Sequence, residues 1–287
     1  MSYRILVPDS RLDRPAWLAA RQTGVTATDV ARLARGGAGT WAAVRAEKDG
    51  TARDFHNSAM QHGTDREGFI ADYALSAFGI TPCHAVVAAD DNPRYLASPD
   101  GVGDEEVGEY KTTVHDWAVL SDAPGRYIDQ TLWQMRVTGR RRGRLVFEPH
   151  ENGVPLYPFP RDFVIEWDAA RVAELEAVAD EFLSGPGEAD ENAAELDALL
   201  TARVEAKDAA DVAAAKVAAY DEQIRELVHG QPTKFEGSLA NLTLSAGSIT
   251  HKFDSTALKQ ADPDTFNRFV KASPVKGRLT ITARTAA

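Results

Sequence analysis

The stretch from residue 95 to residue 113 constrains the fold more than any other part of this 287-residue chain. Residues 95–98 form a short extended run, and the Pro-Asp-Gly that follows is typical of a turn. Residues 107–113 are rich in Val, Tyr and Thr, which favour β-strands. The sequence therefore predicts a β-hairpin with Asp100 at the end of its first strand.

The alternation of side chains along a strand decides which residues meet at this hairpin. Glu109 and Lys111 project from one face, and Tyr110 projects from the other. The hairpin brings Asp100 towards Glu109, and two crowded carboxylates repel each other unless a cation lies between them. Hard divalent ions such as Mg²⁺ take such ligands together with water and phosphate oxygens. The pattern indicates metal-assisted phosphodiester chemistry, although a solvated strand face beside an ordinary turn has the same residues.

Length, composition and cysteine content place the chain among soluble globular proteins. A chain of 287 residues with 44% apolar and 26% charged residues favours one large domain with appendages. The single cysteine, Cys83, excludes a disulfide within the chain and a four-cysteine iron–sulfur cluster, and it fits a cytoplasmic location. Residues 1–15 have no signal-peptide pattern, and no apolar run is long enough to span a membrane.

The negative charge of the chain is confined to its middle. The net charge is −11 overall, −2 over residues 1–150, −13 over residues 151–230 and +4 over residues 231–287. The part that carries the hairpin is therefore close to neutral. This distribution suits a protein that binds DNA in a local groove better than one that coats DNA.

A helix that starts near residue 26 is a candidate phosphate site. Thr26 or Thr28 is expected to cap it, and the free N–H groups at such a helix start attract anions. Arg21, just upstream, is placed to bind the same anion with two hydrogen bonds. An ordinary capped helix with a surface arginine would give the same pattern.

Two further helices carry candidate site residues. The helix predicted over residues 58–78 has Glu67 at the edge of its apolar stripe, where it either reaches inward or is solvated. Asp65 and Asp72 are competing acids on that helix. The stripe itself consists of Phe69, Ile70, Tyr73, Ala74, Ala77 and Phe78.

The helix predicted over residues 126–138 places Gln130 and Gln134 on one face. These amides either serve a site that holds water and phosphate or are simply exposed. The basic cluster that follows is predicted to lie beside the site and to contact a DNA backbone, or else to be a solvated turn. It consists of Arg140, Arg141 and Arg142, with Arg144 nearby.

The remaining segments complete a three-part organisation. Residues 1–184 form the core, residues 185–230 an acidic helical arm that serves as an arm or an oligomer contact, and residues 231–287 a small, mildly basic module. Helices are expected at 17–22, 38–48, 169–183, 188–228 and 264–271, and strands at 84–89, 145–147, 155–159, 164–167, 242–244, 248–253 and 278–283.

Five short motifs, in order, resemble those of the lambda-exonuclease and YqaJ-like recombinase branch of the PD-(D/E)xK nucleases. The resemblance covers residues 15 to about 180. The motifs are Arg21 with the Val-Thr-Ala-Thr-Asp-Val of residues 25–30, the Gly-x-x-x-Glu of residues 63–67, the Ser-Pro-Asp-Gly of residues 98–101, the Glu-Tyr-Lys-Thr of residues 109–112, and the Tyr-x-x-Gln-x-x-x-Gln-Met of residues 127–135.

This resemblance implies an α/β (α+β) restriction-endonuclease-like core, in which helices flank a central mixed sheet. It also implies the site. One divalent metal is held by Asp100, Glu109 and the Tyr110 carbonyl, and Glu67 helps to hold that metal or a second one. Lys111 orients or deprotonates the attacking water, Gln130 and Gln134 position the water or the scissile strand, and Arg21, Thr26 and Thr28 bind a 5′-phosphate.

The activity implied by the resemblance is a 5′→3′ exonuclease on double-stranded DNA ends. It would use Mg²⁺, or Mn²⁺ in its place, leave 3′ tails and work with a single-strand annealing protein as a ring-shaped homo-oligomer. The alternatives are an endonuclease with the same core and a non-catalytic DNA-end-binding adaptor. Tyr110 and Thr28 depart from the family pattern, where a smaller apolar residue and a serine are usual, but neither change removes a ligand or a hydroxyl.

Overall fold

The computed structural model describes residues 3–51, 58–185, 190–248 and 253–270. The strand predicted at 278–283 and most of that predicted at 248–253 lie outside the described residues. The chain divides into two compact units, residues 1–212 and residues 213–285, and each is described by itself. The three-part division made from the sequence stays a prediction.

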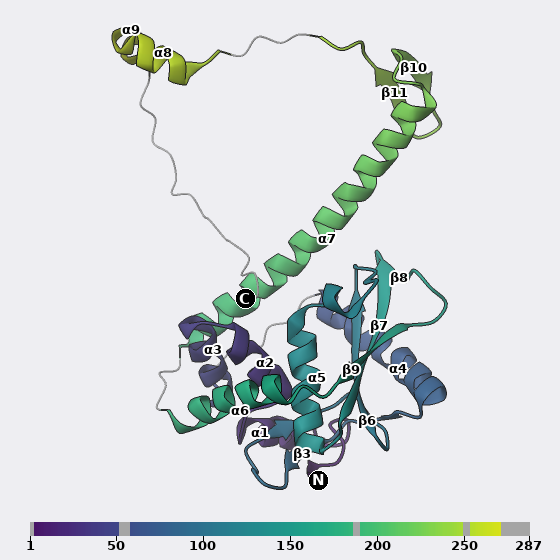
Figure 1. Cartoon of the computed structure of the whole chain (residues 1–287), viewed down its shortest axis with the longest axis vertical. Coiled ribbons are helices and arrows are strands. Elements are labelled where there is room, and N and C mark those ends of the chain that lie inside the picture. Colours follow the sequence, from purple (N-terminus) through teal and green to yellow (C-terminus); the bar gives the residue numbers. More distant parts are fainter. Residues whose placement is uncertain (1–2, 52–57, 186–189, 249–252, 271–287) are drawn as a thin grey trace. The chain divides into compact units, whose positions relative to one another are not determined.

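The first unit holds almost all the regular structure (Figure 1). Its helices are α1 (Arg14–Gln22), α2 (Ala27–Arg35), α3 (Ala38–Lys48), α4 (Ser58–Phe78), α5 (Gly125–Thr138), α6 (Ala169–Ser184) and the first part of α7 (Glu191–Leu227), with a 3₁₀ turn at Leu120–Asp122. Its strands are β1 (Tyr3–Val7), β2 (Thr81–Pro82), β3 (Val86–Ala89), β4 (Leu96–Ala97), β5 (Gly101–Val102), β6 (Glu106–Thr113), β7 (Arg142–Glu151), β8 (Val154–Pro155) and β9 (Arg161–Glu166).

The central sheet is mixed, as predicted. Its order is β2-β5-β6-β7-β8, and β9 also pairs with β7. Strands β6 and β7 are parallel and place Glu109 opposite Leu145, whereas β5 runs antiparallel to β6 and places Gly101 opposite Gly108. A second small sheet has the order β1-β3-β4.

Helices cover both faces of the central sheet. Leu145 and Phe147 point into the main core, which includes Trp133 of α5. Val146, between them on β7, points to the other face and packs with Tyr110 and residues of α4. The expected α/β core with helices on a mixed sheet is confirmed.

The predicted hairpin is correct only in its second strand. Strand β4 pairs with β3 and not with β6, so the first strand of the hairpin is the short β5. Leu96 is fully buried and pairs with Ala88 of β3, so this segment belongs to the smaller sheet, and its N–H also donates to the Val25 carbonyl at 2.9 Å. Asp100 comes directly before β5, in the segment that connects β4 of the smaller sheet to β5 of the central sheet.

Other differences reflect tertiary packing. The buried positions of α4 include Ile70, Ala71 and Ala74, whereas the predicted stripe members Phe69 and Ala77 are exposed. The strand expected at 155–159 shrinks to β8. Strand β1 was not expected from the sequence, and it forms by pairing with β3.

The second unit contains the rest of α7, the hairpin of β10 (Thr233–Glu236) and β11 (Asn241–Leu244), and helices α8 (Ser255–Ala261) and α9 (Pro263–Phe269). The expected strand at 242–244 and helix near 264–271 are confirmed. Among the residues that the structure describes, every helix is too short or too polar to cross a lipid bilayer.

Candidate active site

The hairpin of β5 and β6 sets two carboxylates against each other. Asp100 directly precedes β5, and the Gly101–Gly108 register places it beside Glu109 of β6. The backbone N–H of Tyr110 donates to Asp100 Oδ2 at 2.7 Å, which orients that carboxyl group. The predicted approach of Asp100 to Glu109 is therefore present in the fold.

Glu109 is completely buried and is held by two side chains. Gln134 Nε2 donates to its Oε2 at 2.6 Å, and Lys111 Nζ forms an ion pair with its Oε1. Tyr110 lies on the opposite face, in the core cluster that contains Ile80. The predicted division of faces, with Glu109 and Lys111 on one side and Tyr110 on the other, is confirmed.

The electrostatics show that the carboxylates are crowded. Burial, followed by the nearby Glu109 charge, raises the pKa of Asp100 to about 8, although Lys111 opposes the shift. Burial disfavours the Lys111 ammonium, but Glu109 and Asp100 outweigh it and raise the pKa of Lys111 above its ordinary value. At neutral pH, the raised pKa of Asp100 favours its protonated form, while Lys111 stays charged.

These residues fit a hard divalent cation. Apart from its ion pair with Lys111, Glu109 Oε1 is buried with no hydrogen-bond partner in the described part of the chain. A carboxyl group whose pKa is raised by burial and by a neighbouring carboxylate is one that a bound cation would return to its ionised form. One or two carboxylates, with water and phosphate oxygens, are sufficient ligands for Mg²⁺.

Glu67 is placed differently from the other two acids. It belongs to α4, which packs on the Tyr110 face of the sheet, whereas Glu109 points to the α5 face. Its charge contributes to the raised pKa of Asp100, so it lies within electrostatic reach of that residue. Among the described residues, no group of three or more Asp, Glu, His or Cys side chains forms a ready metal cluster. The pair Asp100–Glu109 is therefore the core of the candidate site, and a metal-binding role of Glu67 stays a prediction.

The site opens into a cleft of about 1380 Å³. Arg126, Tyr127, His62 and His150 line it without having been singled out as site residues from the sequence. The Tyr127 ring lies 5.3 Å from Lys111 Nζ, and the rings of His62 and His150 lie 4.4 Å apart. The residues that line the cleft include Glu67, Asp100, Tyr110, Lys111, Trp117, Arg126, Tyr127, His62, His150, Ala202, Glu205 and Asp208.

Gln130 and Gln134 do not have the places predicted for them. Gln134 is fully buried against Glu109 and cannot reach DNA in this conformation, so its predicted DNA contact is wrong. Gln130 is half-buried and is not among the residues that line the cleft. Because α5 packs on β6, Gln134, which lies one turn further along the helix than Gln130, contacts the Glu109 carboxylate.

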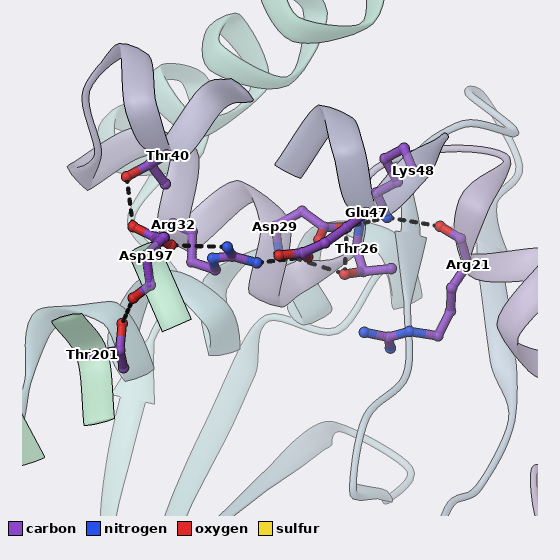
Figure 2. Close-up of polar contacts among 9 residues, drawn as sticks. All are labelled: Arg21, Thr26, Asp29, Arg32, Thr40, Glu47, Lys48, Asp197 and Thr201. Carbon is purple, nitrogen blue, oxygen red and sulfur yellow. Dashed lines mark hydrogen bonds and ion pairs between the residues drawn. The ribbon is translucent and has the colours of Figure 1, made fainter. Parts of the chain in front are cut away.

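The predicted phosphate site at α2 has a clear N-cap. Thr26 caps the helix and donates its hydroxyl to Asp29 Oδ2 at 2.7 Å, so this buried side chain acts as a structural cap. Lys48 Nζ pairs with Asp29 Oδ2 at 2.5 Å and donates to the Arg21 carbonyl at 2.8 Å, as Figure 2 shows. Thr28, in the first turn, is exposed.

The Arg21 guanidinium lies over the Trp17 ring, 4.5 Å from its centroid. Burial lowers the pKa of Arg21, although Asp29 opposes the shift. A guanidinium that has lost much of its water beside a helix start favours an anionic partner. Arg21 and Thr28 thus remain the candidates for an anion, whereas Thr26 is occupied by the cap.

The arginine cluster lines a hollow separate from the cleft of the candidate site, and its predicted contact with a DNA backbone stays a prediction. Arg140, Arg141 and Arg142 line a separate hollow of about 560 Å³ together with Asp104, Glu105 and Glu166. Arg142 pairs in register with Glu106, at the start of β6, three residues before Glu109. Arg141 stacks on Trp167 at 3.9 Å, and Arg142 forms an ion pair with Glu166 at 3.4 Å.

Comparison with known proteins gives a match to one family profile and several structural likenesses. The profile of the YqaJ-like viral recombinase domain matches residues 16–141. An alkaline exonuclease from Laribacter hongkongensis, LHK-Exo, is 27% identical, with a TM-score of 0.49 and coverage of 67% of this chain and 97% of that one. The same enzyme in complex with dAMP gives 26% identity at the same coverage and TM-score. A phage-related exonuclease from Haemophilus somnus 129PT is 12% identical, with a TM-score of 0.44 and coverage of 55% of this chain and 92% of that one. Comparison with curated proteins gave no match.

Proposed function

Residues 16–141 place this chain in the YqaJ-like viral recombinase family, and from that premise we propose that it is a Mg²⁺-dependent deoxyribonuclease that digests double-stranded DNA ends in the 5′→3′ direction. The products would be nucleotides and duplexes with 3′ single-stranded tails. Mn²⁺ is expected to replace Mg²⁺, because both are hard ions that prefer carboxylate ligands.

One observation carries the proposal. Asp100 lines the cleft beside the fully buried Glu109, and burial together with the Glu109 charge raises the pKa of Asp100 to about 8. Glu148, another fully buried acid, is instead paired with Arg66 through hydrogen bonds at 2.6 and 2.7 Å. The carboxylate pair of the cleft is better explained as a cation site.

The side chains around the pair have separable roles. A bound Mg²⁺ at Asp100 and Glu109 would supply Lewis-acid chemistry and acidify a water. Because its pKa is raised, Lys111 keeps its proton and is suited to orient the water and to bind the developing negative charge rather than to act as a base. Gln134 holds the Glu109 carboxylate in place through its 2.6 Å hydrogen bond.

The proposed polarity depends on the start of α2. Arg21 and the exposed first turn around Thr28 are suited to bind the 5′-terminal phosphate. The ring-shaped homo-oligomer and the single-strand annealing partner stay predictions. Mass photometry of the purified chain, alone and with a candidate annealing protein, tests both.

Digestion of a linear duplex that carries a label at either the 5′ end or the 3′ end of one strand tests the activity. We expect the 5′ label to be released early in a Mg²⁺-dependent reaction, while the 3′ label stays in long fragments. A closed circle should not be cleaved. Digestion of the circle would indicate an endonuclease. Tight binding without digestion, with or without Mg²⁺, would indicate the non-catalytic adaptor.

A further inference from the structure

The beginning of α7 is anchored to the core of the first unit. Asp197 accepts a hydrogen bond from Arg32 Nη2 at 2.9 Å and another from Thr40 Oγ1 at 3.1 Å, as Figure 2 shows. One turn earlier, Ala194 is buried against Ala43 and Ala46 of α3. This end of the helix is therefore fixed in place.

The next turns of α7 line the cleft that contains the candidate active site. Arg126 Nη2 donates to Glu205 Oε1 at 3.4 Å, and His115 Nε2 lies 4.0 Å from Asp208 Oδ2. Arg126 also donates to the Tyr127 hydroxyl at 3.0 Å, and the Tyr127 ring is the one that lies beside Lys111. Glu205 of α7 thus reaches Arg126, whose neighbour Tyr127 lies beside Lys111.

The contact between residues 202–209 of α7 and the rest of the cleft is weak. Apart from the two acids, the α7 residues that line the cleft are alanines at positions 202, 206 and 209, which fill little space and bury little apolar surface. The side chains of Glu205 and Asp208 keep 38% and 54% of their exposure, and ion pairs exposed to this degree contribute little. The contacts of Asp197 hold the start of the helix, whereas residues 202–209 make few interactions with the cleft.

A carboxylate on an arginine imitates the phosphate that a nuclease cleft has to bind. We propose that residues 202–209 of α7 form an acidic strap that competes with the DNA backbone for Arg126 and His115, so that DNA must displace the strap to enter the cleft. The proposal rests on the proposed function in that it takes DNA as the ligand of this cleft. It also assigns Arg126 and His115 as backbone-binding residues, a role that the sequence did not indicate.

The test is fluorescence anisotropy with the full chain and a labelled 20-base-pair duplex bearing 5′-phosphates, in EDTA so that binding is separated from cleavage. The variant E205Q/D208N removes the two competing charges. Its matched control, D221N/E222Q, removes the same charge from the same helix at positions that do not line the cleft. We expect E205Q/D208N to bind about five-fold more tightly than the wild type, as the loss of two weak competing contacts would give, and the control to change binding less than two-fold.

A double-mutant cycle identifies the site of competition. Arg126→Ala should weaken binding, and E205Q should give no further gain in the R126A background, because the contact that it relieves is already absent. Equal tightening by the strap variant and the control, or the same gain from E205Q with and without Arg126, would show a general charge effect and overturn the proposal.

Failure of the strap is distinguishable from failure of the nuclease assignment. Wild-type digestion of DNA together with unchanged binding by E205Q/D208N would overturn the strap alone. Tighter binding by that variant without digestion by any variant would overturn the nuclease alone and support the strap.

Discussion

Gln134 of α5 donates a 2.6 Å hydrogen bond to Glu109 of β6, and both side chains are fully buried. Because Lys111 pairs with the other carboxylate oxygen, Glu109 is held from both sides by side chains that cannot be replaced by water without a rearrangement. The helix thus fixes the orientation of the carboxylate that is proposed to hold the metal.

Replacing Gln134 by Ala should lower both stability and activity. One Glu109 oxygen would lose its buried donor, which costs about 1–3 kcal/mol of unfolding free energy. Gln130→Ala, on the same helix but outside the cleft, should change stability by about 0.5 kcal/mol or less. Urea unfolding and digestion rates of the two variants would measure this difference, and equal losses at both positions would contradict the assigned role of Gln134.

Glu109→Gln should abolish Mg²⁺-dependent cleavage, by about a thousand-fold or more, because an amide is a poor ligand for a hard cation. The isosteric amide keeps the cavity filled and is preferable to Ala, which would leave Lys111 and Gln134 facing an empty space. Glu106→Gln is the matched control on the same strand, since Glu106 pairs with Arg144 at 3.2 Å outside the cleft. That control should lose some stability while keeping its digestion rate.

The sequence was sufficient to predict most helices of the core, strand β6 and the residues of the carboxylate pair. Alternation along residues 107–113 predicted the faces of Glu109, Tyr110 and Lys111, because strand geometry fixes them locally. The capping pattern likewise predicted that α2 starts near Thr26 or Thr28, and Thr26 is the cap. Both are short-range features, and the structure confirms them.

What the sequence did not reveal depends on packing between distant segments. The partner strand of β4 is set by burial of Leu96 against β3, and the choice of Gln134 over Gln130 is set by the rotation of α5 on the sheet. The contact of Glu205 with Arg126 joins residues 79 positions apart, and no local pattern could have shown it. The positive charge of the arginine cluster was visible in the sequence. Its position beside Glu106, at the start of β6, was not.

Asp100 predicts a dependence of stability on pH. Its pKa is raised from 3.8 to about 8 in the folded protein, so the folded state binds this proton more tightly than the unfolded chain does. The resulting stabilisation is therefore lost as pH rises between those values. In thermal melts of the metal-free protein, the Tm of the wild type should fall across this range more steeply than that of Asp100→Asn.

Mg²⁺ should reverse this loss, because it binds the ionised pair and displaces the proton. Addition of Mg²⁺ should therefore raise the Tm of the wild type more at pH 8.5 than at pH 6.5, and should leave Asp100→Asn nearly unchanged at both. A Mg²⁺ effect of the same size in that variant would place the cation elsewhere.

Arg21→Ala should slow digestion of 5′-phosphorylated ends more than digestion of 5′-hydroxyl ends. Arg14 provides the matched control, because both guanidiniums lie over the Trp17 ring at 4.5 Å, whereas Arg21 is the one that acts electrostatically on Asp29 in the first turn of α2. Arg14→Ala should leave the preference for a 5′-phosphate intact. Competition between 5′-phosphorylated and 5′-hydroxyl ends in one reaction would measure this preference. Equal slowing of digestion at both kinds of end by Arg21→Ala would argue against a phosphate contact.

The central claim, that Asp100 and Glu109 share one divalent cation, is tested most directly by anomalous diffraction from crystals of the protein soaked in Mn²⁺. The account predicts one strong Mn²⁺ peak within coordination distance, about 2.3 Å, of a carboxylate oxygen from each residue, and its loss in Glu109→Gln. A Mn²⁺ peak that contacts neither residue, in a protein that still digests DNA, would contradict the claim.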